Sequence, residues 1–146
     1  MRRQLGSALL VAVVVTATAA PATSAAAPGA AEIMLTADFA TGVETFTSTG
    51  AFCSSGTAQT SDLRIVGGNG GLTFHLVKNL VCSDGSGSLM ISVDAATSLG
   101  RPWQDQGGWS VQGGTGQWAG ASGGGNLVGA YVPGGVIDDY VGVIAR

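Results

Sequence analysis

The side chains that could carry out acid–base chemistry in this chain are few and widely spaced. His75 is the only histidine, and the carboxylates of Asp84 and Asp94 follow it along the chain. Because histidine titrates near neutral pH, a carboxylate approaching it across a sheet would make it a general acid or base. A histidine that is exposed, or that makes only structural hydrogen bonds, is the alternative interpretation. The spacing fixes no partner, so no catalytic residue is assigned.

Two adjacent carboxylates, Asp138 and Asp139, lie close to the C-terminus. Neighbouring side chains of a strand point to opposite faces of the sheet, so these two cannot form a carboxylate pair by themselves. One of them should face the interior, where a buried carboxylate needs a partner. Two interpretations stay open for that carboxylate, a structural hydrogen bond and a contact with a ligand.

Two glycine-rich stretches match chemical patterns but lack the structural context that the chemistry needs. Residues 120–124 match G-x-S-x-G, yet no helix is predicted to follow Ser122, and the only histidine precedes it. Residues 114–119 match G-x-G-x-x-A, which binds a dinucleotide only where a helix begins. The glycines that follow would not sustain a helix, so both stretches are predicted to be turns. No cofactor and no metal site are expected.

Three tryptophans, Trp103, Trp109 and Trp118, fall within sixteen residues of one another. Trp109 and Trp118 lie in predicted strands and are expected in the core. Trp103 lies in a predicted loop, where it could stack on a sugar ring or cap the mouth of a barrel. The candidate ligand-binding residues are His75, Trp103, Trp109, Trp118, Asp138 and Tyr140.

Cys53 and Cys82 are the only cysteines, and we predict that they form a disulfide. Two cysteines in a small exported domain favour this interpretation over a metal or redox pair, because the chain has no C-x-x-C motif. In the chain-entropy model, closing a loop of about 30 residues contributes roughly 3.5 kcal/mol to stability.

The first thirty residues predict the location of the protein. A basic head, an apolar run of about eight residues and an alanine-rich tail are typical of a secretory signal peptide. The apolar run is shorter than the roughly 20 residues that span a bilayer, so no membrane span is expected. We predict a signal peptide over 1–30, with cleavage between 24 and 30, and an extracellular location. Residues 31–42 are expected to be partly disordered, and residues 43–146 to form one domain.

The charge balance of the remaining chain excludes some partners. After residue 30 there are four Lys and Arg residues against nine acids, which is a net charge near −5. Nucleic acids and anionic membranes select clustered basic residues, so neither is expected as a partner.

The pattern of the elements is all-β. Short runs of alternating or β-branched residues are separated by glycine doublets and triplets, which permit tight hairpin turns. We predict a single antiparallel β-barrel of about eight short strands, after a cleaved signal helix, because closure removes exposed edges. Residues 99–108 are predicted to be a loop. The predicted strands are 43–47, 60–66, 72–77, 89–94, 109–111, 116–119, 126–132 and 136–144.

The second half of the chain resembles small secreted actinobacterial proteins related to the allene oxide cyclase and dirigent barrels. The matching stretches are W-S-V at 109–111, G-T-G-Q-W-A-G at 114–120, G-G-G-N-L-V-G at 123–129 and I-D-D-Y-V-G at 137–142. The paired cysteines also match, although Trp118 replaces the usual tyrosine. The resemblance covers residues 45–144 and implies an eight-stranded antiparallel barrel. It carries no catalytic residue onto this chain.

Together these observations predict a secreted, disulfide-bonded barrel, and they favour a binding function over an enzymatic one. The expected partner is a small apolar ligand or a surface partner. One alternative is an isomerase or cyclase like those of the allene oxide cyclase and dirigent groups, acting in the barrel cavity. Such barrels need few polar groups, because they act by holding a reactive substrate in a dry cavity. A further alternative is glycan binding through Trp103. The oligomeric state stays open.

Overall fold

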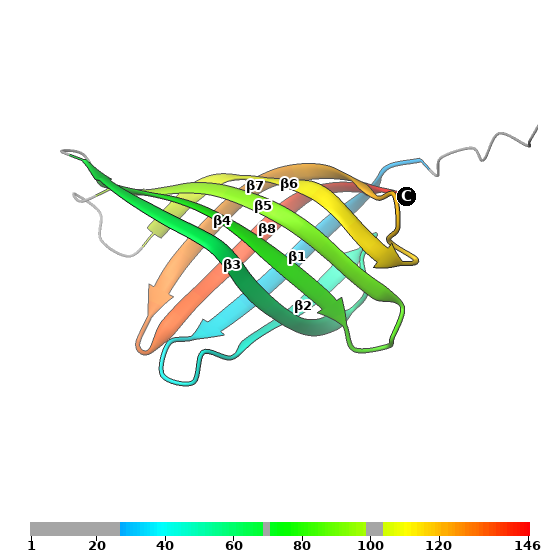
Figure 1. The fold of residues 1–146 in the computed structure, drawn as a ribbon, viewed down its shortest axis with the longest axis horizontal. Helices are drawn as coiled ribbons and strands as arrows, with labels where there is room; N and C mark the ends of the chain where they lie inside the picture. The colour runs from blue at the N-terminus through cyan, green and yellow to red at the C-terminus, as the bar shows by residue number, and fades with distance from the viewer. Residues whose placement is uncertain (1–26, 69–70, 99–103) are drawn as a thin grey trace, which may run out of the picture.

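The computed structural model describes residues 27–68, 71–98 and 104–146, and the elements in these ranges are eight β-strands. Each strand pairs antiparallel with the next, and β1 pairs with β8, so the sheet closes into a barrel (Figure 1). The predicted all-β antiparallel barrel is therefore confirmed. No helix in the described ranges is long and apolar enough to cross a membrane. The strands are β1 Gly29–Asp38, β2 Glu44–Gly50, β3 Ser55–Gly68, β4 Gly71–Cys82, β5 Gly87–Ser98, β6 Gln104–Gly116, β7 Ser122–Val132 and β8 Gly135–Ala145.

The barrel begins earlier in the chain than the sequence predicted. β1 lies largely within the segment 31–42 that was expected to be partly disordered, and it pairs along its length with both β2 and β8. Its alternation of buried Ala31, Ile33, Leu35 and Ala37 with exposed residues is that of a strand. Alanine has a weak strand propensity, so pairing on both edges supplies what local preference lacks. Residues 1–26 of the predicted signal peptide lie outside the described residues.

Two further predicted boundaries were wrong. Residues 117–119 of the predicted strand 116–119 instead form a tight turn with Gly120, in which the Trp118 amide donates to the Thr115 carbonyl at 3.0 Å. The predicted loop 99–108 extends too far, because β6 already begins at Gln104 and pairs with β5 and β7. The strands are also longer than predicted, from 7 to 14 residues.

A β-bulge in β3 decides which side chains of that strand face the interior. The register with β4 shifts between Ser61 and Arg64, and Asp62 has a positive φ of 51°. Strict alternation from Thr60 would turn Asp62 and Arg64 inward. The extra residue instead turns Leu63 inward, where it lines the interior cavity, and leaves Arg64 paired with His75.

One end of the barrel is filled by aromatic side chains and the two cysteines, and we call it the packed end. Phe52 stacks on Phe46 with ring centroids 5.5 Å apart, and it meets Trp118 edge-on at 4.8 Å. The Cys53 and Cys82 sulfurs lie at bonding distance, 2.10 Å apart, as the predicted disulfide requires. β1 begins and β8 ends at this same end of the barrel (Figure 1), and Gly29 and Ile144 are register partners there.

The bulge gives a test of the β3 geometry. Left-handed backbone costs an ordinary L-residue about 1–2 kcal/mol, most for a β-branched one, and glycine nothing. We therefore expect Asp62→Val to lower the free energy of unfolding by about 1–2 kcal/mol and Asp62→Gly to leave it unchanged or slightly higher. Denaturant titration of both variants checks this. Equal destabilisation by glycine and valine would contradict the assigned backbone conformation, since the Asp62 side chain is exposed.

Candidate functional site

The barrel interior contains a cavity of about 350 Å³ on the side away from the packed end. Its walls are largely apolar, formed by Ala37, Phe39, Leu63, Ile65, Phe74, Leu76, Val93, Ala95, Leu127 and Val136. Its polar lining residues are Glu44, Thr60, Lys78, Asp105, Tyr131, Asp138 and Tyr140. The volume lies at the lower end of the range for ligand pockets, about 300–1,000 Å³.

A buried ion pair stands on one side of this cavity. Lys78, which is 4% exposed, donates from Nζ to Oε2 of Glu44 at 2.8 Å and to Oγ1 of Thr60 at 2.7 Å. The Thr60 hydroxyl in turn donates to the other Glu44 oxygen at 2.6 Å. Each member therefore bonds to both others, and this offsets the cost of removing two charges from water.

Two more carboxylates, Asp105 and Asp138, are each 8% exposed, and neither has a basic side chain in bonding contact among the described residues. The Tyr131 hydroxyl donates to Oδ2 of Asp105 at 2.9 Å, and the Tyr140 hydroxyl donates to Oδ2 of Asp138 at 3.2 Å. Oδ1 of Asp105 is buried and has no hydrogen-bond partner among the described residues. The site thus holds one lysine and three carboxylates.

Gly129 lies between these two acids, because it pairs with Asp105 on β6 and with Asp138 on β8. A Cβ atom at Gly129 would stand 2.5 Å from Oδ1 of Asp138 and 3.3 Å from Cβ of Asp105. The Asp138 carboxylate therefore lies over the glycine, in space that any other residue would take. We call Asp105, Gly129 and Asp138 the acidic niche.

Burial sets the ionisation of the acidic niche. It raises the pKa of Asp138 to about 6, with Asp105 and Glu44 adding to the rise and Lys78 opposing it. Burial also raises the pKa of Asp105, against the opposing hydrogen bond from Tyr131. Low polarity disfavours a charge that no neighbouring cation balances.

The two tyrosines remain hydrogen-bond donors at physiological pH. Burial, followed by the hydrogen bond to Asp105, raises the pKa of Tyr131 to about 12. Burial and the charge of Asp138 raise the pKa of Tyr140 well above its usual value. Each phenol can therefore orient its carboxylate partner without losing its own proton.

The residues predicted to bind a ligand separate into different parts of the structure. Asp138 and Tyr140 both line the cavity, and Asp138 is the inward-facing member of the adjacent pair, as expected. Trp109 is in the core and meets Tyr140 edge-on, with centroids 6.5 Å apart. Trp118 is buried at the packed end, while Trp103 lies outside the described residues.

His75 lies on the outer surface of the barrel, away from the cavity. Its Nδ1 makes a hydrogen bond with Oδ1 of Asp94, its register partner on β5, and both side chains are at least half exposed. Asp94 is thus the carboxylate that approaches across the sheet, but the pair faces solvent. The described residues that line the cavity include no histidine.

Sequence reasoning missed the rest of the polar lining. The signal for Lys78 was present, because it continues the inward alternation of Phe74 and Leu76 and precedes the buried Leu80. Asp105 was missed because it fell in the predicted loop. Glu44 and Thr60 carry no signal of their own, since only barrel closure brings β2 and β3 beside Lys78.

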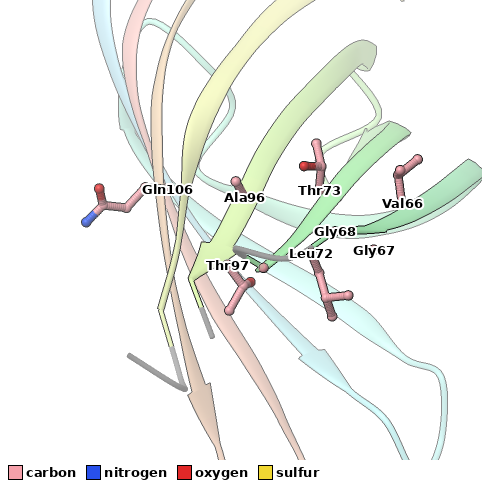
Figure 2. Close-up of a pocket in the computed structure, with 9 residues that line it drawn as sticks. Val66, Gly67, Gly68, Leu72, Thr73, Ala96, Thr97 and Gln106 are labelled. Atoms are coloured by element: carbon pink, nitrogen blue, oxygen red, sulfur yellow. The ribbon is translucent and has the colours of Figure 1, made fainter. Parts of the chain in front are cut away.

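A second hollow, of about 490 Å³, lies where β3, β4, β5 and β6 approach one another. Figure 2 shows that its side chains do not converge: Leu72 and Thr97 point to one side, Thr73 and Val66 to the other, and Gln106 stands apart. None of its described lining residues is ionisable. The interior cavity is therefore the stronger candidate for a site.

Within the described ranges, no group of three or more His, Cys, Asp or Glu side chains is arranged to hold a metal ion. Comparisons of the chain with protein-family models, with curated proteins and with solved structures found no match. The fold and the site together show a closed eight-stranded barrel that is packed at one end and has an interior cavity with charged lining residues. The resemblance to allene oxide cyclase and dirigent barrels stays a prediction.

The raised pKa of Asp138 predicts how stability depends on pH. Between its ordinary value near 4 and about 6, the folded protein binds more protons at this group than the unfolded chain does. The free energy of unfolding should therefore fall as pH rises across this window, by about 2 to 3 kcal/mol, and then stay level. Denaturant titrations from pH 4 to 8 should show this fall in the native protein and a smaller one in Asp138→Asn. Superimposable slopes would contradict the raised pKa.

Proposed function

We propose that this protein is a secreted binding protein that holds a small, largely apolar ligand in the barrel cavity. The observation that carries the proposal is the interior cavity itself. Its volume is about 350 Å³, and its walls are mainly apolar with a few polar groups. Natural ligand sites combine these two features, because apolar area supplies affinity and fixed polar groups supply orientation. A barrel that served only as a rigid surface would fill both ends, as this one fills its packed end.

The proposed extracellular location rests on the sequence of residues 1–30 and agrees with the cysteine pair. Cysteine sulfurs at bonding distance persist as disulfides in oxidising compartments. A surface partner and a glycan held through Trp103 remain alternative occupants of the outer face. The cavity favours the small ligand over both.

An isomerase or cyclase acting in the same cavity is the second candidate. It is favoured by Asp138, a carboxyl group with a pKa of about 6 beside the Tyr140 hydroxyl, because buried acids of this kind suit proton transfer. Recovery of the bound compound distinguishes the two functions. A binding protein returns its ligand unchanged, whereas an isomerase returns a product of the same mass and a different structure.

A pair of adjacent substitutions tests the cavity. Ala95 lines it, whereas Ala96 points outward from the same strand, so Ala95→Leu fills the cavity and Ala96→Leu serves as the matched control. Protein purified from its own culture supernatant without delipidation should carry a bound mass in native mass spectrometry. We expect Ala95→Leu to lose that mass, or to bind the identified compound at least about tenfold more weakly, while Ala96→Leu stays within about twofold.

Two results would count against the proposal. A bare mass from the native protein, together with no change in tryptophan fluorescence on adding apolar compounds, would indicate an empty cavity. Equal loss of binding in Ala95→Leu and Ala96→Leu would place the ligand outside the interior. Trp109 is the natural reporter, because it contacts Tyr140 in the cavity wall.

A further inference from the structure

Building on the proposed binding function, we infer that the ligand is a small primary amine. Its ammonium group would lie at the acidic niche, between the carboxylates of Asp105 and Asp138. The apolar body of the amine would fill the rest of the cavity. Four observations support this assignment: the charge balance, the hydrogen bonds already made, the unpartnered oxygen and the glycine.

The charge balance of the cavity leaves room for a cation. Its lining includes the carboxylates of Glu44, Asp105 and Asp138, but Lys78 is its only described basic side chain. Lys78 is bonded to Glu44 and Thr60, which engage two of its three ammonium donors. With all groups ionised, the described lining carries two negative charges that no basic side chain of the described residues balances through a bond. A neutral ligand would enclose these charges further from water, whereas an ammonium ion would compensate them.

The tyrosine hydrogen bonds of the two acids engage only one oxygen of each carboxylate. In both carboxylates it is Oδ2 that accepts from a tyrosine, Tyr131 or Tyr140. Oδ1 of Asp105 is buried without a partner among the described residues, although buried carboxylate oxygens in native proteins are almost always bonded. A donor on the ligand would satisfy this oxygen. Both tyrosine hydroxyls already donate to carboxylates.

Gly129 makes a shared site out of the two acids. Because Gly129 has no side chain, Oδ1 of Asp138 can lie over β7 on the same side as Asp105. A Cβ atom at Gly129 would stand only 2.5 Å from this oxygen. An ammonium nitrogen needs carboxylate oxygens at about 2.7–2.9 Å, and it has three donors to distribute among them. A metal ion would need more ligands, and no suitable group is present in the described residues.

The test uses three probes that share one apolar body: phenethylamine, phenethyl alcohol and phenylacetate. They carry an ammonium, a hydroxyl and a carboxylate group respectively. In calorimetric titration at pH 8, we expect the amine to bind at least about tenfold more tightly than the alcohol, and the carboxylate not at all. The native protein is used throughout.

Three matched variants locate the recognition. Asp105→Asn and Asp138→Asn each remove one charge of the niche, and Asp139→Asn removes the same charge from the outer face one residue away. We expect each niche variant to weaken amine binding about tenfold or more and to leave alcohol binding within about threefold. Asp139→Asn should leave both within about twofold. Retained alcohol binding shows that the niche variants still fold and still have a cavity.

A pH series adds a readout that mere packing would not change. The ionisable groups that face Asp138 come from five strands and are Glu44, Lys78, Asp105, Tyr131 and Tyr140. Lowering the pH from 8 to 5 protonates Asp138 but not an alkylamine, so amine affinity should fall about tenfold. Alcohol affinity should change less than about twofold.

The outcomes separate this inference from the function on which it rests. If the alcohol binds as tightly as the amine and Ala95→Leu abolishes both, the cavity binds ligands but the amine assignment is wrong. If Asp139→Asn weakens amine binding as much as Asp105→Asn does, the ammonium group lies elsewhere, and the assignment is again wrong. If none of the three probes binds the native protein, the amine assignment fails, and the bound mass and the fluorescence titration described above then decide the proposed function.

Discussion

The pairing of β1 with β8 is the constraint on which the rest of this structure depends. It closes the sheet, so that neither edge is left with a row of unpaired backbone groups. Closure also fixes an inside and an outside for every strand, because successive side chains point to opposite faces of the sheet. The buried Ile33 of β1 is the register partner of the buried Tyr140 of β8 across this seam, and Leu35 is the partner of Asp138. The interior charges have a fixed location only because this seam is closed.

The two ends of the barrel interior differ in what they contribute to stability. The packed end contains stacked aromatic rings and the cysteine pair, whose loop closure restricts the unfolded chain. The other half holds buried charges that lower stability by themselves. Such a cavity can persist in a domain of this size because the packed end and the continuous hydrogen-bonded sheet stabilise the fold independently of it. This division of roles is the physical basis of the proposed binding function.

The sequence predicted the class of fold more completely than the site. Alternating residues and glycine turns are local signals, and they indicated most strands and the cysteine pair. The site depends on relations that no local pattern carries. Glu44 meets Lys78 only through the order of the strands, and Leu63 faces inward only because Asp62 adds a residue to β3. Alternation predicted that one of the adjacent acids, Asp138 or Asp139, faces the interior, but Asp105 was assigned to a loop. Gly129 fell inside the predicted strand 126–132, but its place between two carboxylates follows only from its two register partners.

Because Gly29 lies beside Ile144, a fusion partner or a solid support can be joined to either end of the described chain on the same side of the barrel. Both ends of the described chain leave the barrel at the packed end, opposite the cavity (Figure 1). A fusion partner, an immobilising tag or a solid support joined at either end would hold the molecule with its cavity facing outward. Because the two ends are neighbours, a short linker between them would also suffice for a circularly permuted chain. The attachment points and the interior cavity thus lie at opposite ends of the barrel.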